Sequence, residues 1–246
     1  TVTTGGQSGV SVDTVSYSVP TITDVRAVGG GAVPLLDTDG TVQVEIEGTD
    51  FGPSDTISTP TATYGENGVE YAATGCTIIS HTVMRCTTVP GVGATLFWQV
   101  SVGTEARTSA TSSGDDHVSY KAPSVSSVVA ASGDKDDMDT ETPGVTLTIT
   151  GDDFGPDSGP VPTVTYQGGS GPVITPASAC TWTTSHTVIS CPVPPGAGAN
   201  LVVTVTTGGQ FGVSVDTVSY SVPTITDVRA VGGGAVPLLD TDGTVQ

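Results

Sequence analysis

The residues Gly48-Thr49-Asp50-Phe51-Gly52-Pro53 follow a run in which apolar and polar side chains alternate, and this combination decides the fold. The run alternates Val42, Val44 and Ile46 with Gln43, Glu45 and Glu47. A period of two is typical of a β-strand that buries one face and leaves the other in water. The Gly-Pro pair is a turn signal, so the strand is expected to end there.

The same combination occurs a second time at residues 151–156, which read Gly-Asp-Asp-Phe-Gly-Pro. The run before it alternates Val145, Leu147 and Ile149 with Thr146, Thr148 and Thr150. Further landmarks follow in the same order in both halves, at residues 61–64 and 163–166, 80–86 and 185–191, 90–94 and 195–199, and 118–120 and 218–220. Two related domains are therefore expected, at residues 20–122 and 123–222.

The composition favours strands over helices throughout the chain. It contains 33 Gly and 17 Pro with abundant Thr, Ser and Val, and it is poor in Leu, Lys and Arg. Such a chain has few helix formers and many strand and turn residues. Short strands separated by turns, at about 100 residues per domain, predict an all-β fold of tandem immunoglobulin-like sandwiches.

A longer repeat encloses both domains. Residues 1–43 reappear as residues 204–246 with one difference, Ser8 against Phe211, so the period from Thr1 to Thr204 is 203 residues. Self-similarity at a fixed period is the signature of repeat proteins. We interpret residues 1–19 as the last strands of a preceding repeat and residues 223–246 as the first strands of a following one. Strand donation between subunits is an alternative, but continuation of one covalent array is simpler.

The four cysteines fall two per domain, Cys76 with Cys86 and Cys180 with Cys191. Even, repeated placement in a Thr-rich acidic chain favours one disulfide within each domain. The alternative is a zinc site that includes His81 or His186. Two Cys and one His per domain are an incomplete ligand set for zinc.

Together these landmarks resemble the IPT/TIG domain, an immunoglobulin-like fold. Both domains have an opening Pro, a strand ending in Gly-x-x-Phe-Gly, two cysteines around Ser-His-Thr, a Pro-Gly-x-Gly turn similar to the Pro-x-Gly-x-Gly turn of the family, and a closing Tyr before the next Pro. For extracellular tandem members the resemblance implies adhesion, recognition or spacing. For nuclear members it implies DNA binding or dimerisation.

The charge balance excludes several partners. With 6 basic and 25 acidic side chains the formal net charge is −19, which has the wrong sign for binding nucleic acid. The same charge disfavours anionic membranes, and no apolar run approaches the roughly 18 residues needed to span a bilayer. We expect an extracellular or cell-surface protein whose many Ser and Thr can carry O-linked glycans.

No catalytic motif is present in the sequence, and we expect no enzyme activity. Gly-x-Ser-x-Gly, His-Glu-x-x-His and the phosphate-binding loop are all missing. His81 and His186 recur, yet neither has an acidic or nucleophilic partner at fixed spacing. A turn or packing role is the favoured interpretation of both histidines.

Acidic clusters are the one feature for which a ligand competes with a solvated loop. The clusters comprise Asp37 and Asp39, then Asp115 and Asp116, then Asp134, Asp136, Asp137, Asp139 and Glu141. Carboxylates from adjacent domains are suited to sharing Ca²⁺, which takes six to eight oxygen ligands. The favoured interpretation is a solvated acidic surface, with no cofactor and no EF-hand loop.

The links between the domains are short. Only two residues separate each closing Tyr from the next Pro, at residues 17–20, 120–123 and 220–223. Proline fixes φ and keeps the preceding residue extended, so the domains are expected to stack as an end-to-end rod. A contact repeated along an axis generates a filament. The sequence thus predicts a self-associating structural protein of an extracellular filament or appendage. The alternatives are an adhesin or receptor stalk that binds a protein or glycan, and an accessory domain of a polysaccharide-degrading enzyme.

Overall fold

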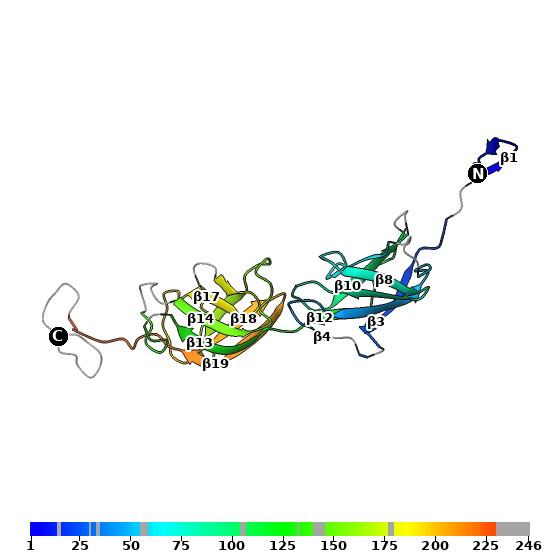
Figure 1. Ribbon diagram of the computed structural model, residues 1–246. Coiled ribbons are helices and arrows are strands. Elements are labelled where there is room, and N and C mark those ends of the chain that lie inside the picture. Colours follow the sequence, from blue (N-terminus) through cyan, green and yellow to red (C-terminus); the bar gives the residue numbers. More distant parts are fainter. Residues whose placement is uncertain are drawn as a thin grey trace, which may run out of the picture.

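The computed structural model describes residues 1–13, 16–29, 31–32, 35–54, 59–103, 107–131, 133–139, 146–176 and 180–229. These residues form strands and turns and no helix, and most of the strands build two β-sandwiches that lie end to end (Figure 1). We call them the first sandwich, within residues 20–122, and the second sandwich, within residues 123–222. The expected all-β sandwich fold is therefore confirmed.

The first sandwich contains a four-stranded and a six-stranded sheet. The four-stranded sheet has the order β3 (Thr21–Ala27), β5 (Gln43–Thr49), β9 (Val83–Thr87), β8 (Thr74–Ser80). The other has the order β4 (Leu35–Leu36), β12 (His117–Tyr120), β10 (Leu96–Val102), β6 (Thr61–Gly65), β7 (Tyr71–Ala72), with β11 (Arg107–Thr108) also paired to β10. Strand β4 is parallel to β12, and the other pairs are antiparallel.

The second sandwich repeats this plan with fewer strands. Its four-stranded sheet has the order β13 (Ser124–Ala130), β14 (Thr146–Asp152), β17 (Val188–Pro192), β16 (Thr181–Thr184). The facing sheet has the order β15 (Thr163–Gln167), β18 (Leu201–Thr207), β19 (Gln210–Val218). A single parallel bridge from Met138 to Tyr220 takes the place that β4 has in the first sandwich.

The period-two pattern places the core. Along β10, Leu96, Trp98, Val100 and Val102 are buried and the residues between them are half-buried, and β18 has the same alternation. The Tyr64 ring stacks on Trp98 with the ring centroids 4.4 Å apart. Burying one such large side chain contributes about 2 to 3 kcal/mol. Val145, expected on β14, lies outside the described residues.

One residue of β5 that was expected to face solvent is buried. Glu45 is only 8% exposed, so the expectation that it faces water is wrong. The Arg85 side chain on β9 explains this, because its Nε and Nη2 atoms donate to Glu45 Oε1 at 2.8 and 2.6 Å. The backbone N–H of Gly29 donates to the other oxygen at 3.4 Å. A carboxylate is tolerated at a buried position when it is paired in this way.

The motif that follows β5 and β14 is a tight turn built around a phenylalanine. A Cβ on Gly48 would lie 1.8 Å from the Thr21 carbonyl oxygen and 2.6 Å from the Phe51 ring, and Gly151 is equally enclosed. The glycine therefore lets the buried ring close under the strand. Asp50 and Asp153 have φ values of 62° and 60°, a conformation that non-glycine residues rarely adopt.

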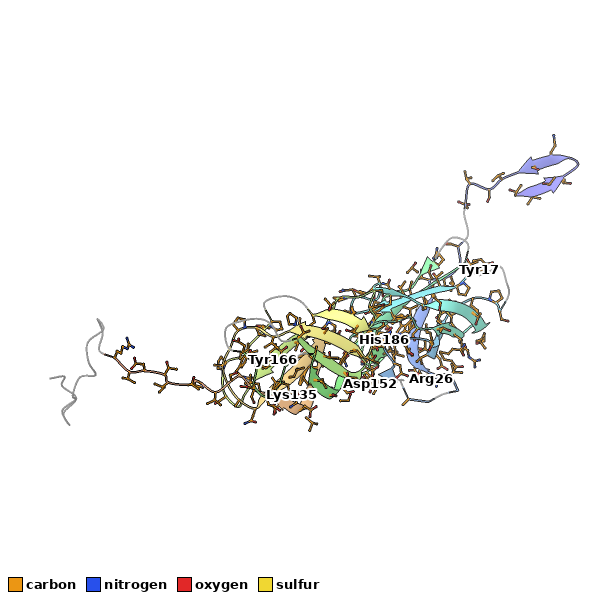
Figure 2. The ribbon with its side chains drawn as sticks, turned by 60° about the vertical axis from the view of Figure 1, so that its left-hand side comes forward. Tyr17, Arg26, Lys135, Asp152, Tyr166 and His186 are labelled. Carbon is orange, nitrogen blue, oxygen red and sulfur yellow. A yellow bond between two sulfur atoms is a disulfide. The ribbon has the colours of Figure 1, made fainter. Side chains whose placement is uncertain are left out.

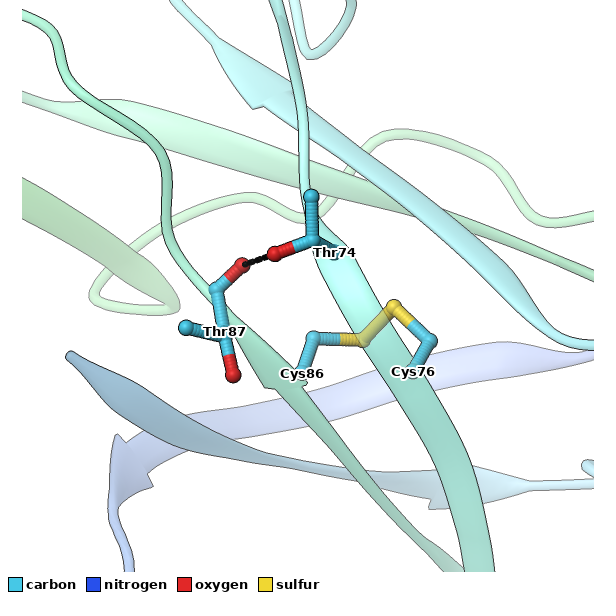
Figure 3. The surroundings of a disulfide bond; sticks show 4 residues. All are labelled: Thr74, Cys76, Cys86 and Thr87. Carbon is cyan, nitrogen blue, oxygen red and sulfur yellow. Dashed lines mark hydrogen bonds between the residues drawn. A yellow bond between two sulfur atoms is a disulfide. The ribbon is translucent and has the colours of Figure 1, made fainter. Parts of the chain in front are cut away.

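One disulfide lies within each sandwich. Cys76 on β8 is joined to Cys86 on β9, and beside this bond the Thr74 hydroxyl donates to the Thr87 carbonyl oxygen at 3.4 Å (Figure 3). Cys180 is joined to Cys191 on β17. The first bond ties β8 to β9, and the second ties the residue just before β16 to β17. All four sulfur atoms are used, which leaves none for the zinc alternative.

Two segments lie outside the sandwiches. A hairpin of β1 (Val2–Thr4) and β2 (Gln7–Gly9) projects from the first sandwich, and residues 221–229 extend beyond the second (Figure 1). Every described residue of the hairpin is exposed. Residues 230–246 of the expected following repeat lie outside the described residues.

Candidate functional site at the domain junction

The connection between the two sandwiches is short and tied down. Lys121 and Ala122 link Tyr120, the last residue of β12, to Pro123, which is buried. The Lys121 backbone N–H donates to the Leu36 carbonyl oxygen at 2.9 Å. Its ammonium group pairs with the Asp37 carboxylate, and this hydrogen bond raises the pKa of Lys121. The linker is thereby held against the first sandwich.

A polar cluster joins the sandwiches directly, and we call Thr38, Asp153 and His186 the junction cluster. Thr38 is 2% exposed. Its backbone N–H and its hydroxyl lie 3.2 and 3.3 Å from Asp153 Oδ1, and the hydroxyl lies 2.9 Å from His186 Nδ1. The hydroxyl has one proton, so when it donates to Asp153 it accepts from the Nδ1–H of His186.

The second sandwich presents its half of the cluster from two left-handed backbone positions. Asp153 belongs to the tight turn after β14, and His186, with φ 67°, lies in the turn between β16 and β17. The two turns hold each other, because Phe154 N–H donates to His186 O and His186 N–H donates to Gly155 O, both at 2.9 Å. Figure 2 places His186 at the end of the second sandwich that faces the first.

The first sandwich presents a loop fixed by two buried tyrosines, Tyr64 and Tyr120, and the half-buried Tyr71. Tyr71 Oη donates to the Val92 carbonyl oxygen at 2.8 Å and accepts from Val92 N–H at 3.1 Å. Tyr64 and Tyr120 bond to each other at 2.7 Å and both bond to Val89. A Cβ on Gly91 would lie 2.7 Å from the Tyr71 ring, so the loop can pack on the rings only with glycine there.

This loop meets the turn between β18 and β19, and we call Gly208-Gly209 the joining turn. A Cβ on Gly208 would lie 2.5 Å from the Gly93 nitrogen, so backbone packs on backbone across the junction. Next to this turn, Gln210 Nε2 donates to the Tyr120 carbonyl oxygen at 3.1 Å. A groove of about 670 Å³ beside the turn is lined by both sandwiches, including Glu66 and Glu70. The Asn67 side-chain amide donates to Glu70 and lowers the pKa of that carboxyl group.

The structure brings together residues that the sequence pattern did not single out as a set. His186 lies in a turn, as expected, but it also contacts Thr38 of the other sandwich. Thr38 and Asp153 carried no signal of a contact. The one sequence hint was the recurrence of Asp50 as Asp153 and of His81 as His186 at matching places.

The acidic clusters are not brought together. Asp37 lies at the junction beside Lys121. Asp134, Asp136, Asp137 and Asp139 surround Lys135 and Met138, near the opposite end of the second sandwich, where Lys135 Nζ donates to the Thr217 carbonyl oxygen at 3.0 Å (Figure 2). Glu141 lies outside the described residues. Among the residues described, no group of three or more His, Cys, Asp or Glu side chains is arranged to hold a metal ion.

The comparisons with known proteins give a family for one sandwich. Residues 123–222 match the model of the IPT/TIG domain, so this segment is an IPT/TIG domain with an immunoglobulin-like fold, as the resemblance implied. IPT/TIG domains are typically binding and structural modules. No curated protein matches the sequence.

Several solved structures resemble the chain at low identity. They include SGBP-B from a complex xyloglucan utilization locus in Bacteroides uniformis, with 14% identity and a TM-score of 0.30 over 83% of this chain and 50% of that chain. The Plexin A4 extracellular region has 16% identity and a TM-score of 0.32, over 87% of this chain and 16% of that chain. The BSP domain of a biofilm associated protein has 14% identity and a TM-score of 0.24 over 78% and 29%. The chain spans half or less of each.

Proposed function

We propose that this chain is the repeating structural unit of an extracellular filament or surface appendage. The observation that carries the proposal is the junction between the sandwiches. A two-residue linker, the buried Pro123, the junction cluster and the backbone contact at Gly208 together restrain one sandwich against the next. Because the 203-residue sequence period begins again at Thr204, the same restrained pair recurs along an array.

Restrained pairs at a fixed period suit a structural role. A rod presents the same surface at regular intervals, and a heterologous contact that repeats along an axis builds a filament. The two disulfides fit an oxidising compartment outside the cell. No helix in the described part of the chain has the length and hydrophobicity needed to cross a membrane. Self-association therefore forms the main partner contact, and exposed Ser and Thr carry O-glycans.

Electron microscopy of the native material tests the proposal. We expect long particles with an axial repeat that corresponds to two sandwiches. Chemical release of O-glycans followed by mass spectrometry checks the glycan component separately. Isolated, flexible monomers at high protein concentration would overturn the filament.

The second candidate is an adhesin or receptor stalk, and the groove at the junction favours it. The groove is lined by both sandwiches and has Glu66, Glu70 and Tyr71 among its lining residues. Paired carboxyl and aromatic groups are suited to binding a sugar or a basic peptide segment. A glycan array and a partner pull-down distinguish the candidates. Saturable binding that is lost in Glu70→Gln, with no axial repeat in micrographs, would favour the stalk.

A further inference from the structure

Each sandwich has two different ends, a presenting end like that of the first sandwich at the junction and a receiving end like that of the second. At its far end the first sandwich presents Thr38 and Gly93, and at its near end the second sandwich receives them with Asp153 and His186. The repeated landmarks give Asp153, His186, Gly93 and Tyr120 counterparts in the other sandwich. One receiving end and one presenting end therefore remain outside the junction already described.

The free receiving end belongs to the first sandwich. Asp50 and His81 occupy the places of Asp153 and His186, and Asp50 has φ 62° where Asp153 has 60°. The backbone frame is shared in part, because Phe51 N–H donates to His81 O at 3.1 Å as Phe154 N–H donates to His186 O at 2.9 Å. Of the two histidines, only His186 has a positive φ. His81 Nε2 lies 3.6 Å from Asp50 Oδ1, and the two side chains are 62% and 38% exposed.

The strained backbone at Asp50 needs an explanation. A non-glycine residue in the left-handed region costs of the order of 1 kcal/mol or more, and such outliers gather at functional contacts. At Asp153 the same conformation aims the carboxylate at Thr38. At Asp50 one carboxylate oxygen accepts from the Thr49 hydroxyl at 3.0 Å, and the other lies near the exposed His81 side chain.

The free presenting end belongs to the second sandwich. Tyr220 N–H donates to Gly198 O at 2.8 Å, as Tyr120 N–H donates to Gly93 O at 2.8 Å. Ser221 N–H donates to Met138 O at 2.8 Å, as Lys121 N–H donates to Leu36 O at 2.9 Å. A groove of about 460 Å³ lies here, lined by Ala197, Gly198, Ala199, Tyr220, Ser221, Val222, Pro223 and Thr224. At the first junction the corresponding surface, beside Gly93, is in contact with the joining turn of the second sandwich.

We propose that the Asp50 and His81 end of the first sandwich docks on the Gly198 and Tyr220 end of the second sandwich of another copy, forming a second junction that alternates with the first. The occupant is a second copy of the first sandwich, because the linker at Pro223 leads into a second copy of residues 20–43. The inference rests on the proposed function, since only an array contains this second junction.

The two junctions share an Asp and a His on the receiving side but differ in the supports on the presenting side. At the second presenting end Ser221 replaces Lys121, which removes the ion pair with the loop of Asp37. Ile174 bridges to Tyr166 where Tyr71 pairs with Tyr64, so the loop at Gly198 lacks the hydroxyl that holds Val92. The second junction therefore has fewer supporting contacts than the first. The array consists of pairs of sandwiches that are held firmly within each repeat and more weakly between repeats.

The test uses the chain lengthened by one period, residues 1–222 followed by residues 20–222. Spin labels on encoded keto amino acids report the distance from Thr181 of the inner second sandwich to Thr77 of the added first sandwich. The same two positions within one copy measure the first junction as an internal standard. We expect a narrow distance distribution at both junctions. Asp50→Asn with His81→Ala in the added copy should broaden the second distribution at least twofold and leave the first unchanged.

The matched control is Glu66→Gln in the added copy, which removes one charge at the opposite end of the same sandwich. It should leave the second distribution narrow. A broad distribution in the unsubstituted chain, or one that Asp50→Asn with His81→Ala leaves narrow, would overturn the inference. Filaments accompanied by a broad second distribution would refute this junction and retain the proposed function. A narrow second distribution without filaments would support this junction and refute the proposed function.

Discussion

At the scale of single residues, Gly208 and Gly209 have the same backbone requirement, but only Gly208 packs against the other sandwich. Substitutions at the two positions therefore distinguish the local effect from the effect on the junction. Both have positive φ, 53° and 76°. A Cβ on Gly208 would meet the backbone of Gly93 at 2.5 Å, whereas a Cβ on Gly209 would meet nothing within 4 Å. Alanine at either position therefore costs about 1 kcal/mol in the second sandwich. Only Gly208→Ala should also push the sandwiches apart.

Chemical denaturation and small-angle X-ray scattering check this pair of substitutions. The two variants should unfold at similar denaturant concentrations, and only Gly208→Ala should change the scattering curve. Equal scattering from both variants would contradict the packing of backbone on backbone.

Thr38 is the donor at the centre of the junction cluster. Thr38→Val keeps the volume but removes the hydroxyl, which leaves Asp153 and His186 without one partner each. A net hydrogen bond is worth about 1 kcal/mol, and the loss should appear as weaker coupling between the sandwiches. A double-mutant cycle with His186→Ala measures it. Thr61→Val, at an exposed position on β6, is the control and should show no coupling.

Glu45 gives the first sandwich a dependence on pH. The hydrogen bond from Arg85 holds the pKa of Glu45 below its ordinary value of 4.5. Because the folded protein binds this proton less readily than the unfolded chain, the pair stabilises the fold fully above about pH 5. That stability is lost as the pH falls through the lowered pKa.

Urea denaturation of Glu45→Gln at several pH values measures this effect. The variant should be less stable at pH 7 by about 1.5 to 3 kcal/mol, the typical range for a hydrogen bond to a charged group. At pH 2 the difference should largely disappear. Glu66→Gln, on an exposed turn, is the control, and a difference independent of pH would exclude the carboxylate as its source.

At the scale of elements, the chain holds identical sequences in two structural contexts. Residues 20–27 and 223–230 have the same sequence, yet Val25 is buried in β3 and its copy Val228 is 59% exposed. Likewise Tyr220 is 3% exposed and its copy Tyr17 is 92% exposed. In the part of the chain that the structure describes, β5 lies beside β3, and no strand pairs with residues 223–229. Tertiary partners, rather than propensity, make these residues a strand.

Amide exchange followed by NMR tests the effect of context. We expect the amides of residues 21–27 to exchange far more slowly than those of residues 224–229, by a factor of at least a hundred. The hairpin of β1 and β2 is an intermediate case, because its register matches that of the β18 and β19 turn although it lacks sheet partners. Equal protection of both copies would contradict this account.

The same contrast explains how far the sequence could predict the structure. The strands along β10 and β18 and the two tight turns follow from local patterns, and so does the pairing of four cysteines within domains. The burial of Glu45 did not, because it depends on Arg85, which comes forty residues later in the chain. The junction cluster joins residues 115 and 148 positions apart, and no local period encodes such a contact.

At the scale of the whole molecule, the array combines strong charge with few basic groups. The net charge of −19 over 246 residues makes neighbouring rods repel each other. Contacts along the axis form despite this repulsion, because the short linker and the junction cluster hold successive sandwiches together. Contacts between rods have no such tether, so they depend on the ions in the medium.

Lateral association should therefore increase with salt. The screening length falls from about 30 Å at 0.01 M to about 8 Å at 0.15 M ionic strength, so rods that repel at low salt can approach one another at high salt. We expect light scattering and electron microscopy to detect single rods at low ionic strength and bundles above about 0.15 M, while the axial repeat stays constant. Sodium chloride and magnesium chloride at equal ionic strength separate general screening from divalent bridging. Bundles that dissolve as salt is added would contradict this account, because they would mean that rods associate through opposite charges, whereas five of the six basic side chains are already in ion pairs within the chain: Arg26, Arg85, Lys121, Lys135 and Arg229.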